Sequence, residues 1–160
     1  MFLRSVMRWR LWPASLLPIG ALFVVLTASG CASVDTVALR GSSNLNNCGG
    51  DEAHSVVVRV YHLRGTGRFE AASFDELWDH RSGVLEDDLI QSPWEHSLTP
   101  ATTEEVKIER TDALQEATAL GIVANFCRRG ENNCWRKVVP LEGRKTATRV
   151  FLSESCISID

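Results

Sequence analysis

Serine, histidine and acidic side chains are the residues of this 160-residue chain whose types could do covalent or acid–base chemistry. A catalytic site needs a nucleophile with an activating base, or two carboxylates aimed at one point. The serines and histidines are scattered without a G-x-S-x-G motif, and the Gly-Thr-Gly at residues 65–67 lacks the rest of a phosphate-binding loop. Glu104 and Glu105 are sequence neighbours, which would point in different directions on a strand. The sequence therefore predicts that this protein is not an enzyme.

Cys31 follows a segment whose composition is typical of a cleaved export signal. Three arginines precede an apolar stretch over residues 11–26, and small residues then lead into Cys31. The apolar stretch is shorter than the roughly 20 residues that a transmembrane helix needs. Ala28-Ser29-Gly30-Cys31 resembles the bacterial lipobox, which implies cleavage after residue 30 and attachment of diacylglycerol and an N-acyl lipid to Cys31. Ala32, rather than aspartate, follows the cysteine, which favours sorting to the outer membrane.

Four cysteines remain once Cys31 carries lipid, namely Cys48, Cys127, Cys134 and Cys156. An even number of thiols in an oxidising compartment predicts disulfides, and three pairings are possible. Cys127 and Cys134 flank a turn-forming loop between two strand-like runs, so they could face each other across a hairpin. Cys48 and Cys156 would then join the two ends of the domain. A metal site made of these thiols and the histidines is the alternative, but no two of these residues have a close spacing such as C-x-x-C, and we expect no metal or other cofactor.

The composition after Cys31 suits one domain of moderate size. Residues 31–160 number 130, enough for a hydrophobic core. Removal of residues 1–30 takes away three of the 17 basic residues and none of the 20 acidic ones, which leaves a net charge of about −6. A negative charge argues against binding to nucleic acid and against electrostatic attraction to a membrane. The acyl chains would hold the protein at the membrane instead.

Short runs of alternating apolar and polar residues predict several β-strands. Residues 55–63 form the strongest of them, with Val56, Val58 and Val60 on one face. Residues 103–109 alternate cleanly, as expected of an antiparallel strand with one face in water. Further strands are predicted over residues 36–40, 118–127, 134–139, 148–152 and 155–159. Together these runs indicate an all-β protein that forms an antiparallel β-sandwich.

A small helical insertion is expected between the strands, at about residues 70–90. Ser73 and Glu76 have the spacing of a capping box, in which the glutamate reaches back to the first residue of the helix. The helix should run to about residue 80, and residues 84–90 suit one or two further turns. The predicted organisation is a signal peptide over residues 1–30, a lipidated tether over 31–35 and the sandwich domain over 36–160.

Aromatic and basic residues leave a ligand-binding role open. Trp94 or Trp135 could stack on a carbohydrate or a peptide, although tryptophans of a small domain more often fill its core. Arg128 and Arg129 lie in the expected turn between two strands, where a partner could reach them. A periplasmic sandwich lipoprotein that binds a carbohydrate or peptide is therefore the alternative function.

Three stretches of sequence follow one another as they do in one known family. They are Val56-Val57-Val58-Arg59-Val60-Tyr61-His62-Leu63 with the Phe69, Ala72, Phe74, Leu77 and Trp78 that follow, then Leu120-Gly121-Ile122-Val123-Ala124-Asn125-Phe126, then Trp135-Arg136-Lys137-Val138-Val139-Pro140-Leu141. Together with the lipobox they resemble the TssJ (VasD, SciN-like) lipoproteins of type VI secretion. The resemblance implies a transthyretin-like β-sandwich with a small helical insertion, and a role without catalysis.

The resemblance also implies a partner and a site. TssJ proteins are held by lipid at the periplasmic face of the outer membrane and bind the periplasmic C-terminal region of TssM, which associates with TssL in a membrane complex. In that family the loop between the first two strands is implicated in TssM binding, and here it corresponds to about residues 42–51. A disulfide from Cys48 to Cys156 would pin one end of this loop and preorganise it for binding. The candidate partner-binding residues are Ser43, Asn44, Leu45, Asn46, Asn47, Gly49, Gly50 and Asp51.

Overall fold

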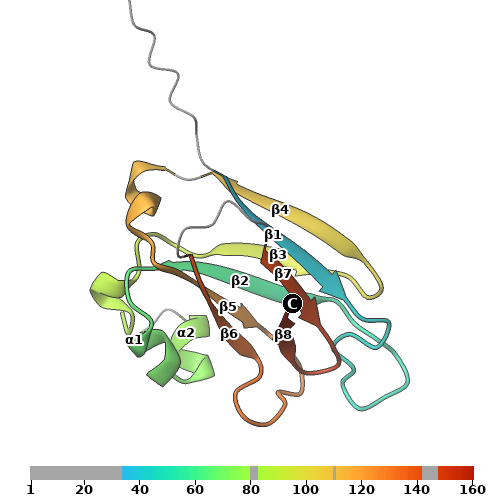
Figure 1. Ribbon diagram of the computed structural model, residues 1–160. Helices are drawn as coiled ribbons and strands as arrows, with labels where there is room; N and C mark the ends of the chain where they lie inside the picture. The colour runs from blue at the N-terminus through green and yellow to red at the C-terminus, as the bar shows by residue number, and fades with distance from the viewer. Residues whose placement is uncertain (1–33, 80–82, 110, 142–147) are drawn as a thin grey trace, which may run out of the picture. The chain divides into compact units, whose positions relative to one another are not determined.

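A computed structural model describes residues 34–79, 83–109, 111–141 and 148–160 of the chain. The described part forms two four-stranded sheets, which pack on one another as a sandwich with small helices at one side (Figure 1). The predicted all-β fold with a small helical insertion is confirmed. The export signal predicted over residues 1–30 and the lipidation site at Cys31 lie outside the described residues.

The first sheet has the strand order β4-β1-β7-β8. Its strands are β1 (Val34–Gly41), β4 (Thr103–Glu109), β7 (Thr148–Leu152) and β8 (Ile157–Ile159). β1 begins within residues 31–35, which we expected to be tether. β1 pairs antiparallel with β4 but parallel with β7. The sequence predicted antiparallel pairing, and this one pair of strands departs from it. The strand before β7 is β6, which belongs to the other sheet. A tight hairpin joins only antiparallel strands, but a connection that crosses between sheets can also place β7 parallel to β1.

The second sheet is wholly antiparallel, with the order β3-β2-β5-β6. Its strands are β2 (Val56–Leu63), β3 (Trp94–Leu98), β5 (Ala119–Ala124) and β6 (Arg136–Pro140). β2 is an inner strand, with Val60 opposite both Trp94 and Ile122. β3 was not predicted, because Leu98 is its one fully buried residue and its sequence lacks an apolar alternation.

The core between the two sheets is formed by alternate residues of the inner strands. Val37 and Leu39 of β1 are fully buried, as are Val58 and Val60 of β2. Two polar side chains, from Asp35 and His62, are buried there as well, with Oδ2 and Nε2 3.6 Å apart. The alternation of apolar and polar residues that predicted these strands thus also indicates which face of each strand packs into the core.

The helical insertion consists of α1 (Gly67–Ala71), α2 (Phe74–Asp79) and the 3-10 turn η1 (Glu86–Asp88); a second 3-10 turn, η2 (Asp112–Glu116), precedes β5. The capping box is confirmed: the backbone N–H of Ser73 donates to Oε2 of Glu76 over 2.8 Å, and the Glu76 N–H donates to Oγ of Ser73 over 3.3 Å. The backbone N–H of Ser73, and then its hydroxyl, which donates to the same oxygen over 2.7 Å, lower the pKa of Glu76 below its ordinary value. α1 begins at Gly67, three residues before the expected start of the insertion.

The insertion packs on the outer face of the second sheet, against β2 and β5. The Tyr61 hydroxyl donates to the carbonyl of Leu77 over 2.7 Å, and burial raises the pKa of this tyrosine. The Phe69 ring lies 5.5 Å from the Tyr61 ring and covers Gly121, where an added Cβ would stand 2.6 Å from the Phe69 ring. A glycine is therefore required at position 121 for the helix to approach the sheet.

Arg136 forms a second fastening between β6 and the insertion. Its guanidinium donates to the carbonyl of Phe69 over 2.9 Å, and also to the carbonyls of Glu70 and Ala72. Burial lowers the pKa of Arg136, since desolvation disfavours its charged form. The neighbouring Trp135 is buried, edge-on to the Phe74 ring at 5.3 Å. The Trp-Arg pair that carried part of the family resemblance thus has a structural role.

Candidate partner-binding loop

Residues 42–55 connect β1 to β2 at the end of the sandwich opposite to the start of β1 (Figure 1). Two backbone hydrogen bonds tie this β1–β2 loop to the β7–β8 turn, from Ser42 N–H to the Leu152 carbonyl (2.9 Å) and from Asn46 N–H to the Ser153 carbonyl (3.4 Å). The Ser42 carbonyl also accepts the N–H of Ala101, which lies in the β3–β4 turn (3.0 Å). The base of the loop is therefore held by two neighbouring connections.

Leu45 is the hydrophobic anchor of the β1–β2 loop. Its side chain is fully buried, and a Cβ added to Gly41 would lie 3.0 Å from its Cδ2. The Leu45 carbonyl accepts the N–H of His54 over 2.9 Å, which closes the loop. A partner on the surface cannot touch the Leu45 side chain, so its effect on binding would come through the position of the loop.

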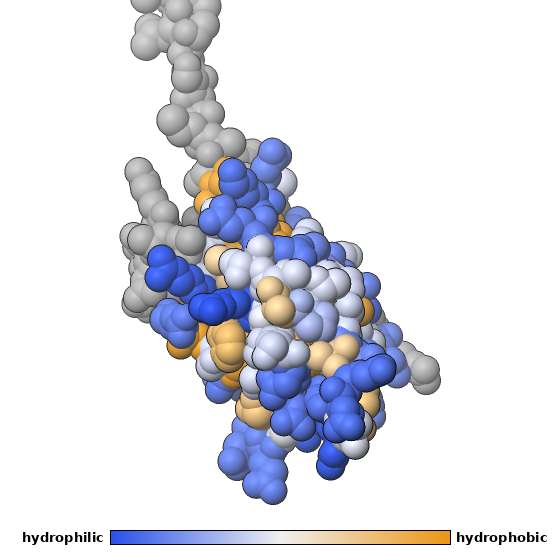
Figure 2. Space-filling view, turned by 90° about the vertical axis from the view of Figure 1, so that its right-hand side faces the viewer, coloured by the Kyte–Doolittle hydropathy of each residue, from blue (hydrophilic) through white to orange (hydrophobic). Residues whose placement is uncertain are grey.

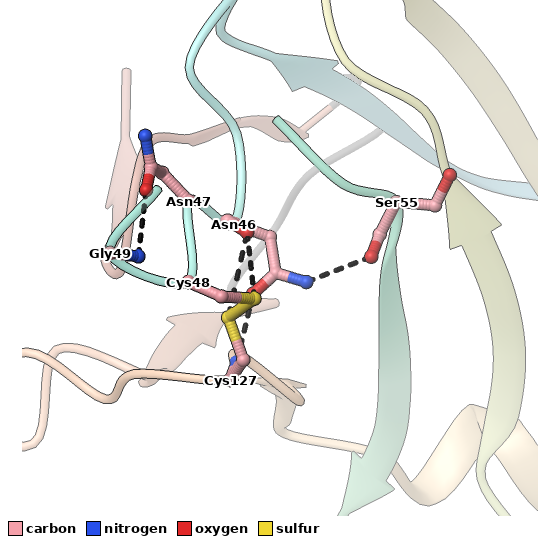
Figure 3. Close-up of a disulfide and its surroundings, with 6 residues drawn as sticks. All are labelled: Asn46, Asn47, Cys48, Gly49, Ser55 and Cys127. Atoms are coloured by element: carbon pink, nitrogen blue, oxygen red, sulfur yellow. Dashed lines mark hydrogen bonds between the residues drawn. A yellow bond between two sulfur atoms is a disulfide. The ribbon is translucent and has the colours of Figure 1, made fainter. Parts of the chain in front are cut away.

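Asn46 is buried as well and uses both ends of its amide (Figure 3). Its Nδ2 donates to the Ser55 carbonyl and its Oδ1 accepts the N–H of Cys127, each over 2.8 Å. Its backbone has a φ of 50°, in the left-handed region that asparagine tolerates better than most residues. The Asn46 side chain is thus hydrogen-bonded both to the last residue of the β1–β2 loop and to the β5–β6 connection.

The four cysteines of the described residues all form disulfides, but in pairs that differ from our expectation. Cys48 is bonded to Cys127 and Cys134 to Cys156, whereas the expected pairs were Cys127–Cys134 and Cys48–Cys156. The β5–β6 register explains the difference. Val123 is opposite Arg136, so the ladder extended would place Cys134 opposite Asn125 rather than Cys127. The two bonds instead link the β1–β2 loop to the β5–β6 connection, and that connection to the β7–β8 turn.

The remaining candidates, Ser43, Asn44, Asn47, Gly49, Gly50 and Asp51, are exposed or half-buried. Local hydrogen bonds order some of them: Ser42 Oγ donates to Oδ1 of Asn44 (2.7 Å), and the Gly49 N–H donates to Oδ1 of Asn47 (2.8 Å). Figure 2 views the sandwich from this end and shows a mostly polar surface with small, scattered apolar spots. Such a surface suits recognition by hydrogen bonds and charges.

The structure separates the two tryptophans proposed for ligand stacking. Trp135 is buried beneath the insertion, so no ligand can stack on it. Trp94 is half-buried, and its ring is stacked on His96 at 5.1 Å. The ligand-binding alternative therefore loses one of its two candidate residues.

The disulfides and the short helices decide whether the described part offers a metal site or a membrane-spanning helix. The four thiols that could have formed a metal site are consumed by the disulfides, and no three His, Cys, Asp or Glu residues cluster suitably elsewhere in the described part. None of the helices within the described ranges has the length and apolar character needed to span a bilayer.

Residues 33–155 match the model of the type VI secretion lipoprotein family, described as VasD, EvfM and TssJ. This chain belongs to that family. No curated protein matches it at a significant level. The match confirms the predicted membership of the TssJ family. The three stretches that carried the resemblance lie in β2 and the insertion, in β5 and the residues that follow it, and around β6.

Solved structures of type VI secretion proteins share the fold. One chain, from a structure described as a type VI membrane complex, is 23% identical with a TM-score of 0.71, and the match covers 81% of this chain and 98% of that one. A chain of a structure described as the TssM C-terminal domain from EAEC is 22% identical, with a TM-score of 0.67 and coverage of 79% and 97%. The lipoprotein TssJ1 from Pseudomonas aeruginosa is 23% identical, with a TM-score of 0.67 and coverage of 81% and 95%.

Proposed function

We propose that this TssJ-family lipoprotein is an outer-membrane adaptor, whose β1–β2 loop binds the periplasmic C-terminal region of TssM. The family match over residues 33–155 is the observation that carries the proposal. The protein acts by binding and not by catalysis, and TssM connects it to TssL. Residues 1–30 are its signal peptide, and the acyl chains on Cys31 hold it at the periplasmic face of the outer membrane.

The arrangement of the domain suits an adaptor. β1 begins three residues after Cys31, so the lipid-bearing end of the chain lies at the start of β1. The β1–β2 loop lies at the other end of that strand (Figure 1). The length of β1 thus separates the loop from the residues next to the lipid. The Cys48–Cys127 disulfide and the buried side chains of Leu45 and Asn46 restrict the loop, which lowers the entropy lost on binding.

The proposal is tested by titrating the full lipidated protein, in detergent, with the C-terminal region of TssM from the same organism. Because Asn44 and Asp51 are exposed on the loop, the double variant Asn44→Ala, Asp51→Ala should bind more weakly. Glu105→Ala, at an exposed position of β4 on the first sheet, is the control and should bind like the wild type. No binding by the folded wild-type protein would refute the proposed function.

A further inference from the structure

Arg128, in the β5–β6 connection, lies against the β1–β2 loop. The Cys48–Cys127 disulfide joins the residues directly before Gly49 and Arg128, with the two Cα atoms 5.5 Å apart. A covalent link between the preceding residues therefore keeps Gly49 and Arg128 side by side. Figure 3 shows how closely this bond brings the two segments together.

Gly49 makes room for the arginine. Its φ is +95°, and a Cβ built on it would lie 2.8 Å from Nη1 of Arg128. Any side chain at this position would be strained by the backbone, and the end of the Arg128 side chain would have to shift to admit its Cβ. The cation consequently lies over the loop backbone at a position that carries no side chain.

The charge of Arg128 is available for a partner. Other arginines form ion pairs within the domain, such as Arg59 with Glu95 and Arg64 with Glu116. Arg128 is exposed, and no carboxylate of residues 34–79, 83–109, 111–141 or 148–160 lies within ion-pair distance of it. A guanidinium offers a planar fork of N–H donors that matches a carboxylate in bidentate geometry.

We propose that Arg128 binds a carboxylate of the partner that docks on the β1–β2 loop, so that the binding surface is composed of two disulfide-linked loops. The inference rests on the proposed function and adds the chemistry that the partner must present. A lipid phosphate is the other anion at hand in an envelope. β1 spans eight residues, about 25 Å, between the lipid-bearing end and this loop, which favours the protein carboxylate.

The test compares variants of the full lipidated protein in detergent, by their affinity for the C-terminal region of TssM. Arg128→Glu should weaken binding about tenfold or more, because it replaces attraction with repulsion. Arg128→Lys should weaken binding less, since the charge remains but the fork is lost. Arg149→Glu makes the same change of charge on the outer face of the first sheet and should alter affinity by about twofold at most. Thermal melting of each variant verifies that it is folded.

Arg128→Ala is measured as well, as a variant that removes the charge without reversing it. Replacing the Asp and Glu residues of the TssM region one at a time by Asn and Gln should identify one change that costs as much affinity as Arg128→Ala does. The two losses should not add when combined. Wild-type affinity of Arg128→Glu would overturn the inference while leaving the proposed function in place. Equal losses for Arg128→Glu and Arg149→Glu would also overturn it, since they would report a general effect of charge. No binding by the wild type would overturn both proposals.

Discussion

At the scale of single residues, Asn46 links more of the candidate site than any exposed residue of the loop does. Its amide bridges Ser55 and Cys127, while its backbone N–H reaches the β7–β8 turn. The resemblance to TssJ proteins marked Leu45 and Asn46 as partner-binding residues. Because their side chains are buried, we expect them to determine the shape of the loop. Under the proposed function, the contacts with the partner would come from their exposed neighbours.

Asn46→Ala should lower the free energy of unfolding by about 3 kcal/mol. The change leaves the Ser55 carbonyl and the Cys127 N–H without their partner, and it places an alanine at a φ of 50°. Urea denaturation measures the loss. Asn44→Ala is the matched control, because the Asn44 side chain is exposed, and its effect should stay below about 0.5 kcal/mol. Equal stability of the two variants would contradict the role assigned to Asn46.

Gly121→Ala should destabilise the domain by about 1–3 kcal/mol, because the new methyl group would overlap the Phe69 ring and push the insertion off the sheet. Gly67→Ala offers a control in the helix that carries Phe69, since a Cβ at Gly67 meets no atom within 4 Å. Thermal unfolding of both variants checks the prediction. A Gly121→Ala protein as stable as Gly67→Ala would show that the insertion is not packed as described.

At the scale of elements, sequence periodicity predicts strands well wherever one face of the strand is buried. β2, β4 and β7 were found in this way, and local hydrogen-bonding chemistry located the start of α2. β3 escaped prediction because Trp94 and His96 are only half-buried at the edge of the sheet. The disulfide pairing could not be predicted from the sequence, because it depends on strand register and on loops that meet only after folding.

The two disulfides should differ in their effect on stability. Cys48–Cys127 closes a separation of 79 residues and Cys134–Cys156 one of 22, which in the chain-entropy model correspond to about 4.5 and about 3.4 kcal/mol. Cys48→Ser, Cys127→Ser should therefore unfold at lower denaturant than Cys134→Ser, Cys156→Ser. The first double variant should also lose partner affinity beyond its loss of stability, because it frees the β1–β2 loop. The reverse order of denaturation midpoints would contradict the entropic argument.

At the scale of the whole molecule, the account places the lipid anchor at one end of β1 and the partner-binding loop at the other. The sequence alone suffices to predict the family, because its motifs are short and linear. The lipid anchor at Cys31 stays a prediction. The composition of the binding surface could not be predicted. Gly49 and Arg128 are far apart in the sequence and meet only through the Cys48–Cys127 bond.

Cys31→Ser should move the protein from the membrane fraction to the soluble fraction, since stable anchoring needs more than one acyl chain and this variant would receive none. Ala32→Asp keeps the lipidated cysteine and changes the sorting residue, so that variant should remain in membranes but shift to the inner one. Fractionation followed by immunoblotting distinguishes these outcomes. Retention of Cys31→Ser in the outer membrane would contradict the lipid anchor.

The most direct test of the central claim is a hydrogen-exchange footprint of the full protein with and without the C-terminal region of TssM. Partner binding should slow exchange in residues 42–55 and 127–135, which form the two disulfide-linked loops. Exchange in the helical insertion and in β4 should stay unchanged, since the account assigns these elements to the scaffold. Protection centred on the insertion, with none in the β1–β2 loop, would contradict the account.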